Sequence, residues 1–242
     1  KIQVGAIQVP FSMDDSTTSN EITFIERASP VALATSVGAQ KGRTAAGVRG
    51  NTSNIFGSLY YTRDPLVLAG GAALPDESNN LVGRAAYLYA PNPDTNIHFG
   101  ASGTRTFNFT QLATTVPGGA AQASTTFQLR DRPELRVDGT RLVDTGLMAV
   151  EDAYVVGPEF GANWKNFYIQ SEYYRYHFDR PDTNAAVPVD LSGFDFDGWY
   201  VQGSWIITGE TKRYDIKSAS FGAPRPKGPF GFGDSLGAFE LA

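Results

Sequence analysis

The chain contains repeated segments of about ten residues in which apolar and polar side chains alternate one for one. Between Trp199 and Ile207 one parity is apolar and aromatic, while the other is largely polar. Residues 97–104, 154–164 and 167–174 repeat this alternation. Because successive side chains of a strand point to opposite faces, each segment is predicted to be a strand with one dry face and one wet face.

The alternation predicts an all-β, antiparallel fold made of nine strands within a single domain. The expected strands are about 1–9, 42–50, 55–63, 81–90, 96–107, 153–164, 167–178, 195–208 and 236 onward. Pro158 falls inside one of them and predicts a local bulge, because proline cannot donate a ladder hydrogen bond.

Two architectures share such strands. In a soluble sandwich the dry faces form the core, whereas in a transmembrane β-barrel they face lipid and aromatic residues mark the strand ends. Tyr154, Trp164, Trp199 and Trp205 lie near the ends of expected strands, as lipid-interface aromatics would. An aromatic core would also place rings there, so the alternation favours neither architecture.

The lengths of the connections favour the barrel. Short and long connections alternate, as in barrels with short periplasmic turns and long outer loops. The short ones are 50–54, 92–96 and 163–166, and the long ones are 10–41, 62–80, 108–152 and 179–194. This alternation of short and long connections assigns the strand-like segment Thr125–Arg130 to the long loop 108–152. It also places 209–235 on the short-turn side, where an unusual length indicates a functional segment.

Composition excludes several classes of function. The chain has no Cys and only two His, which excludes disulfide frameworks, thiol nucleophiles and Cys-ligated metals. A net charge of −5 without a long basic run argues against nucleic acid as a partner. Motifs of nucleophile elbows and dinucleotide sites are missing, and we interpret His98 and His177 as ordinary polar residues. Neither enzymatic activity nor a cofactor is expected.

Positive charge is concentrated in part of the chain. Between Arg27 and Arg63 the balance is +5, whereas the remainder carries −10. Lys41, Arg43 and Arg49 share one parity and would face the lumen if the intervening apolar residues face lipid. Other basic residues lie in the long connections, namely Arg130, Arg132, Arg136, Lys212, Arg213 and Lys217. Cations that line a pore attract anions, and arginine matches phosphate oxygens bidentately. Without a barrel, the same residues would be ordinary surface charges.

Short motifs occur in a fixed order along the whole chain. They are Val4–Ser12, Thr18–Arg27, Arg130–Glu134, Leu142–Gly146, Asp197–Gln202, Thr208–Glu210, Phe221–Gly222, Pro224–Lys227 and Gly237–Ala242. Together they resemble the phosphate-selective porin O and P family.

The resemblance implies a sixteen-stranded barrel of the Gram-negative bacterial outer membrane, which assembles as a homotrimer among lipid and lipopolysaccharide. Such a porin passes phosphate or polyphosphate by passive diffusion, and three of its connections fold inward. Their counterparts here are 10–41, 108–152 and 209–235. On this mapping the chain is an internal fragment, incomplete at both ends.

In such a barrel, the concentrated basic residues are the ones that we expect to attract anions and line the pore. These are Arg27, Lys41, Arg43, Arg49, Arg130, Arg132, Arg136, Lys212, Arg213 and Lys217. Gln8 and Val9 stand where the family commonly has a basic residue, and segment 10–41 is net acidic. A porin with a broader or non-phosphate preference therefore stays an alternative, as does a soluble all-β ligand- or carbohydrate-binding module.

Overall fold

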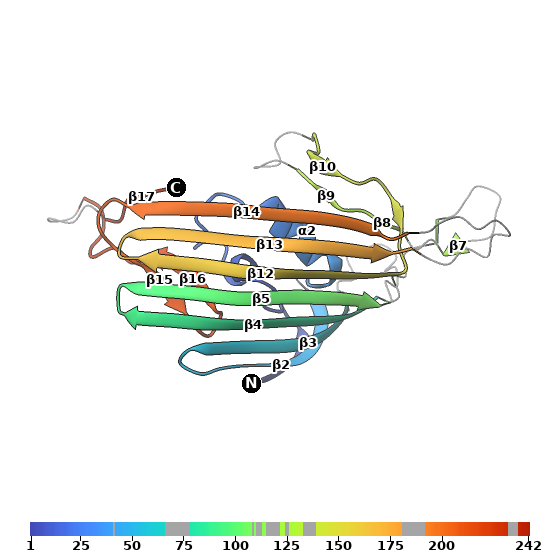
Figure 1. Ribbon diagram of the computed structural model, residues 1–242, viewed down its shortest axis with the longest axis horizontal. Coiled ribbons are helices and arrows are strands. Elements are labelled where there is room, and N and C mark those ends of the chain that lie inside the picture. The colour runs from blue at the N-terminus through green and yellow to red at the C-terminus, as the bar shows by residue number, and fades with distance from the viewer. Residues whose placement is uncertain are drawn as a thin grey trace.

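Nine strands form one antiparallel sheet in the computed structural model, and each strand pairs with its neighbours in chain order (Figure 1). The structure describes residues 1–40, 42–65, 78–107, 109, 113–114, 122–123, 126–132, 139–180, 192–231 and 237–242. The strands are β1 (Ile2–Ala6), β2 (Arg43–Asn51), β3 (Ile55–Pro65), β4 (Asn79–Asn92), β5 (Thr95–Phe107), β12 (Asp152–Trp164), β13 (Phe167–Asp179), β14 (Phe194–Ile206) and β17 (Glu240–Leu241). The nine predicted strands are therefore confirmed. We refer to this sheet as the wall.

The remaining elements lie in the connections. Helices α1 (Met13–Ser16) and α2 (Ser29–Gly38) belong to the link between β1 and β2, whose residues 7–40 we call the inward loop. The link between β14 and β17 contains β15 (Lys212–Asp215) and β16 (Ser220–Pro224), which pair as a hairpin. The described residues of the link between β5 and β12 form three short pairs, namely β6 (Ala113–Thr114) with β7 (Gln122–Ala123), β8 (Thr126–Phe127) with β11 (Met148–Ala149), and β9 (Arg130–Asp131) with β10 (Val143–Asp144). As predicted, the described part of Thr125–Arg130 stays outside the wall.

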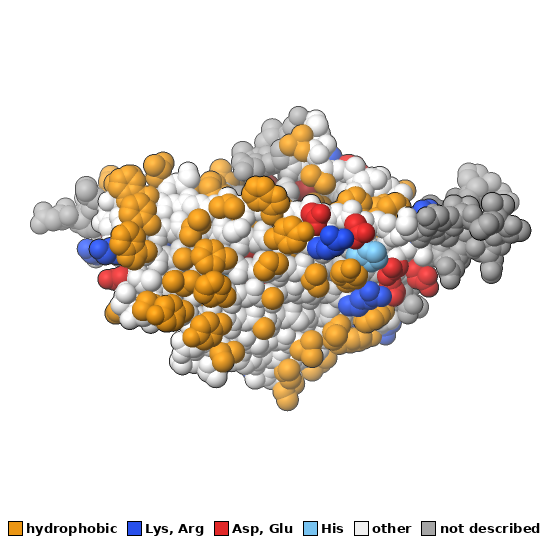
Figure 2. All heavy atoms as spheres, in the orientation of Figure 1, with side chains coloured by type: hydrophobic (Ala, Val, Ile, Leu, Met, Phe, Trp, Pro, Cys, Tyr) orange, Lys and Arg blue, Asp and Glu red, His pale blue; other side chains and the backbone are white. Residues whose placement is uncertain are grey.

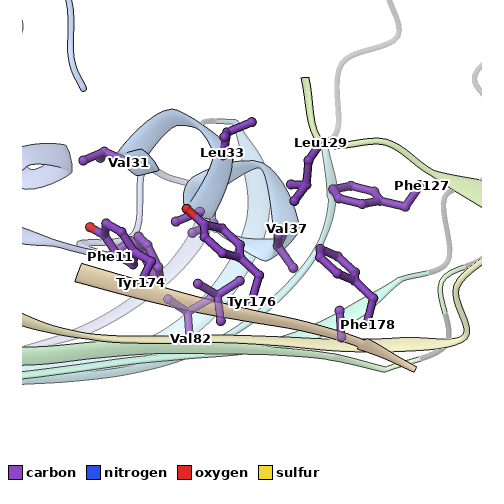
Figure 3. Packing of buried hydrophobic residues seen from close by; sticks show 14 of the residues in the cluster. Phe11, Val31, Leu33, Val37, Val82, Phe127, Leu129, Tyr174, Tyr176 and Phe178 are labelled. Carbon is purple, nitrogen blue, oxygen red and sulfur yellow. The ribbon is translucent and has the colours of Figure 1, made fainter. Parts of the chain in front are cut away.

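The inward loop and the hairpin cover the same face of the wall (Figure 1). Helix α2 lies over β13 within the main hydrophobic cluster, where Val37 points toward Phe178, whereas Leu33 lies on the side of the helix away from the sheet (Figure 3). A proline in its first turn favours the start of α2, because that position needs no backbone N–H.

Wall hydroxyls stabilise the end of α2. Thr106 Oγ1 donates to the carbonyl oxygen of Val37 at 2.8 Å, and Thr62 Oγ1 donates to that of Gly38 at 3.0 Å. These bonds satisfy carbonyls that a helix end leaves without partners. Gly38 is needed for this approach, since a Cβ there would lie 2.6 Å from Thr104 Oγ1.

The other face of the wall is apolar and exposed (Figure 2). Large side chains on it include Val48, Leu59, Leu81, Phe99, Val156, Phe160, Ile169 and Val201. The rings of Trp164, Phe167 and Trp205 stack next to the β12–β13 turn, with centroids 6.3 and 6.1 Å apart. Tyr154 stacks on His177 at 5.0 Å toward the opposite end, whereas Trp199 lies in the middle of β14.

Charged residues on this outer face gather toward the long-connection end of the described strands, with a few more at the short-turn end (Figure 2). Arg105 pairs with Asp152 at 2.9 Å, and Arg175 pairs with Asp195 at 3.2 Å. No helix in the described part of the chain is long and apolar enough to cross a membrane.

The predicted bulge at Pro158 is wrong. The register between β12 and β13 is the same at Val156↔Arg175 and at Glu159↔Glu172, so no residue is inserted. The ladder is only interrupted over Gly157 and Pro158. A Cβ on Gly157 would lie 1.9 Å from the carbonyl oxygen of Tyr173, which shows how closely β13 approaches there.

Candidate functional site

Two pockets on the inner face bring predicted cations together. The first, of about 300 Å³, lies between the inward loop and β2. It is lined by Gln8, Val9, Pro10, Asp15, Ser16, Thr17, Thr18, Ser19, Arg27, Arg49 and Ser218. The second, also about 300 Å³, is lined by Phe24, Glu26, Arg27, Ala28, Ser29, Asp131, Arg132, Tyr200, Val201 and Gln202. Arg27 therefore lines both pockets, with Arg49 in the first and Arg132 in the second.

Arg27 is held by the turn that precedes it in the inward loop. Its Nη2 donates to the carbonyl oxygen of Thr17 at 2.6 Å, and its Nη1 donates to the carbonyl oxygen of Asp14. The carboxylate of Asp14 lies 3.4 Å from Nη1, and 17% of the arginine side chain stays exposed. The guanidinium is thus fixed in place while part of it faces the pockets.

Helix α1 places Asp14 behind Arg27. Ser12 caps the helix by accepting from the backbone nitrogen of Asp15 at 3.3 Å. The wall residue Glu172 accepts from the backbone nitrogen of Asp14 at 3.0 Å and from Ser12 Oγ at 3.3 Å. Burial raises the pKa of Asp14 to about 6, although Arg27 opposes the shift.

Arg43 and Arg49 both point to the inner face, because Ala46 and Val48 between them are exposed on the outer face. Arg49 is half-buried and lines the first pocket. Arg43 is 5% exposed, and its Nη1 donates to Ser78 Oγ at 3.3 Å, so it is packed beneath the surface. Lys41 lies outside the described residues.

The basic residues of segment 108–152 are dispersed. Arg132 is half-buried in the second pocket next to Asp131, whereas Arg130 is exposed on β9. Arg136 lies outside the described residues. Of the two members of this group that the structure describes, Arg132 is the one that lines a pocket with Arg27.

The three basic residues of the hairpin lie in different surroundings. Lys212 is buried, with Nζ 2.7 Å from Glu240 Oε1 and 2.9 Å from Thr23 Oγ1, and burial lowers its pKa. Arg213 is half-exposed 3.6 Å from Glu21, and Lys217 is exposed in the hairpin turn. Lys212 therefore joins the hairpin to β17 and to the inward loop, and it does not face the pockets.

Replacing Lys212 by Met tests this placement. We expect the unfolding free energy to fall by about 1–3 kcal/mol because Glu240 loses its partner, with the anion preference that the sequence predicts unchanged. Thermal unfolding and bilayer reversal potentials measure the two effects. Arg213→Met is the matched control, since loss of a half-exposed pair costs at most about 1 kcal/mol. A shifted reversal potential with unchanged stability in Lys212→Met would contradict the placement.

The sequence interpretation missed the buried polar residues of the wall. Arg84, His98, Glu159, Gln170 and Glu172 are all less than 4% exposed on its inner face. Four of them lie on the polar parity of a strand, which predicts the side they face but not their partners, whereas Arg84 shares its parity with Val82, Ala86 and Leu88. Gln170 and Glu172 contact α1, Arg84 and His98 contact the hairpin, and Glu159 contacts Arg84 and His98.

A comparison with family models finds that phosphate-selective porin O and P matches residues 1–242, the whole chain. A search of the curated proteins gives no match.

Proposed function

Because the chain belongs to the phosphate-selective porin O and P family, whose members are bacterial outer-membrane porins, we propose that Arg27 and Arg49 form the principal anion site of its lumen. The solutes are small anions of the phosphate class, which diffuse passively. At the level of the family the protein is a channel rather than an enzyme. The homotrimer and the contact with lipopolysaccharide stay predictions.

The observation that carries the proposal is the position of Arg27 between the two pockets. Among the charged residues that line them, the first pocket has Arg27 and Arg49 against Asp15, a balance of +1. The second has Arg27 and Arg132 against Glu26 and Asp131, a balance of zero. An anion is therefore bound more strongly in the first pocket than in the second. Conduction requires sites that bind an anion weakly enough to release it again.

The acidic residues beside the arginines favour a broad preference. Asp15 in the first pocket offsets one of its two positive charges. Arginine forks fit the oxygens of any tetrahedral oxyanion. We therefore propose that sulfate competes with phosphate, and that selectivity for phosphate over other small anions is modest.

Block of chloride current by added phosphate tests the site in porin isolated from outer membranes and placed in planar bilayers. Wild type is expected to show block, and cation selectivity or the lack of block would contradict the proposed function. Arg49→Gln should weaken block by about 3- to 10-fold, since loss of one hydrogen bond from this half-exposed side chain costs about 0.7–1.4 kcal/mol. The matched control is Arg63→Gln, because Arg63 is exposed on the neighbouring strand with outward parity. Equal effects of the two variants would contradict the assignment of Arg49.

A further inference from the structure

Arg84 of β4 contacts the wall, the inward loop and the hairpin at once. Its side chain and that of Glu159 are both 0% exposed, and its Nη2 lies 2.8 Å from Glu159 Oε2. Nη1 donates to Ser16 Oγ at 3.0 Å and to the carbonyl oxygen of Ser218 at 2.8 Å, and Nη2 donates to the carbonyl oxygen of Ala219 at 2.7 Å. One guanidinium thus holds the inward loop and the hairpin to the same point of the wall.

The wall is shaped to receive this ion pair. Glu159 belongs to β12, and β5 lies between it and β4. Gly100 of β5 leaves the space through which the carboxylate reaches Arg84, since a Cβ there would lie 3.0 Å from Glu159 Oε2 and 2.8 Å from His98 Nε2. A buried guanidinium requires such a partner, because an unpaired charge in this position is strongly destabilising.

The turn of the hairpin depends on the same contacts. Ala219 has φ +49°, a left-handed conformation that is unfavourable for a residue with a Cβ, and it is fully buried. The carbonyl groups of Ser218 and Ala219 both accept from Arg84. Tyr214 adds a second link, because its hydroxyl lies 2.7 Å from Nδ1 of His98, whose Nε2 lies 3.2 Å from Glu159. The hairpin tip is therefore held in place by the wall.

The residues that Arg84 holds also line the first pocket. Ser16 and Ser218 both do so, together with Arg27 and Arg49. Ser16 ends helix α1, which carries the Asp14 and Asp15 that modulate the arginines. We propose that Arg84 is a positioning residue that fixes the inward loop and the hairpin against the wall and thereby sets the width of the pore and the shape of its anion site. The effect on anions rests on the proposed function, whereas the effect on width does not.

Removal of the whole ion pair tests the proposal without leaving an orphan charge. In the variant Arg84→Met/Glu159→Met the barrel should still fold, because an apolar pair of similar volume can replace a buried ion pair. We expect the single-channel conductance in chloride to rise about twofold or more, since the inward loop and the hairpin are no longer hydrogen-bonded to Arg84 and can move away from the lumen. Phosphate block should weaken in the same variant. Arg84→Lys keeps the charge but not the forked geometry and should give an intermediate conductance.

Cross-linking provides the matched control. The chain has no Cys, so Ser16→Cys/Ser218→Cys can be bridged with a short bifunctional thiol reagent in the background of the double variant. Bridging is expected to return conductance toward the wild-type value. Unchanged conductance in Arg84→Met/Glu159→Met, with only a lower unfolding temperature, would overturn the proposal. Increased conductance in a porin whose wild type shows no phosphate block would support the positioning role and contradict the anion site.

Discussion

Replacing Arg27 by Gln is expected to weaken phosphate block of the chloride current by about 10- to 100-fold. The loss of hydrogen bonds from a charged group costs about 1.5–3 kcal/mol, which corresponds to that range. The effect should exceed that of Arg49→Gln or Arg132→Gln, because Arg27 lines both pockets and each of the others lines one. Bilayer measurements at low ionic strength are best suited, since salt screens the attraction.

Two controls separate charge from structure in this experiment. Arg27 also donates to the carbonyl oxygens of Asp14 and Thr17, so Gln could loosen the inward loop. Arg27→Lys keeps the positive charge and should retain more of the block than Gln. Arg213→Gln removes a half-exposed arginine that lines neither pocket and should have little effect. Equal block in wild type and Arg27→Gln would contradict the shared role of Arg27.

The wall could be predicted from sequence because its determinants are local. Alternation with period two decides which face each strand residue occupies, and strands that pair in chain order require no long-range information. Arg43 and Arg49 show both the strength and the limit of this reasoning. Their common inward direction follows from parity, but parity does not tell that Arg43 is covered and that Arg49 lines a pocket.

The site could be predicted only in part because its contacts join distant residues. Lys212 lies in a basic, anomalous connection, which suggests a pore-lining cation. Its actual partners are Glu240 and Thr23, the latter 189 positions away in the chain. Arg84 is an isolated arginine in an otherwise ordinary strand, and its role depends on Ser16, Ser218 and Glu159. These residues become neighbours only when the inward loop and the hairpin fold onto the inner face of the wall. No periodicity in the sequence predicts such contacts.

Acidification from pH 7.5 to pH 5 is expected to increase the affinity of the pore for anions by about two- to fivefold, with a midpoint near pH 6. Burial raises the pKa of Asp14 to about 6, so the carboxylate is ionised above that pH and neutral below it. The ionised form lies 3.4 Å from Arg27 and offsets its charge. Protonation removes this offset and leaves Arg27 more attractive to an anion in either pocket.

The choice of anion and of variant makes this experiment specific. Sulfate is the appropriate blocker, because its charge is constant over this range while that of phosphate changes. The titratable and charged groups packed around Asp14 are Arg27, Asp15 and Glu172. Asp14→Asn removes the carboxylate of Asp14 and leaves these neighbours in place. It should give strong block at both pH values, with little dependence on pH. A pH response of wild-type size in Asp14→Asn would assign the titration to another group, and a flat wild-type profile would contradict the coupling between Asp14 and Arg27.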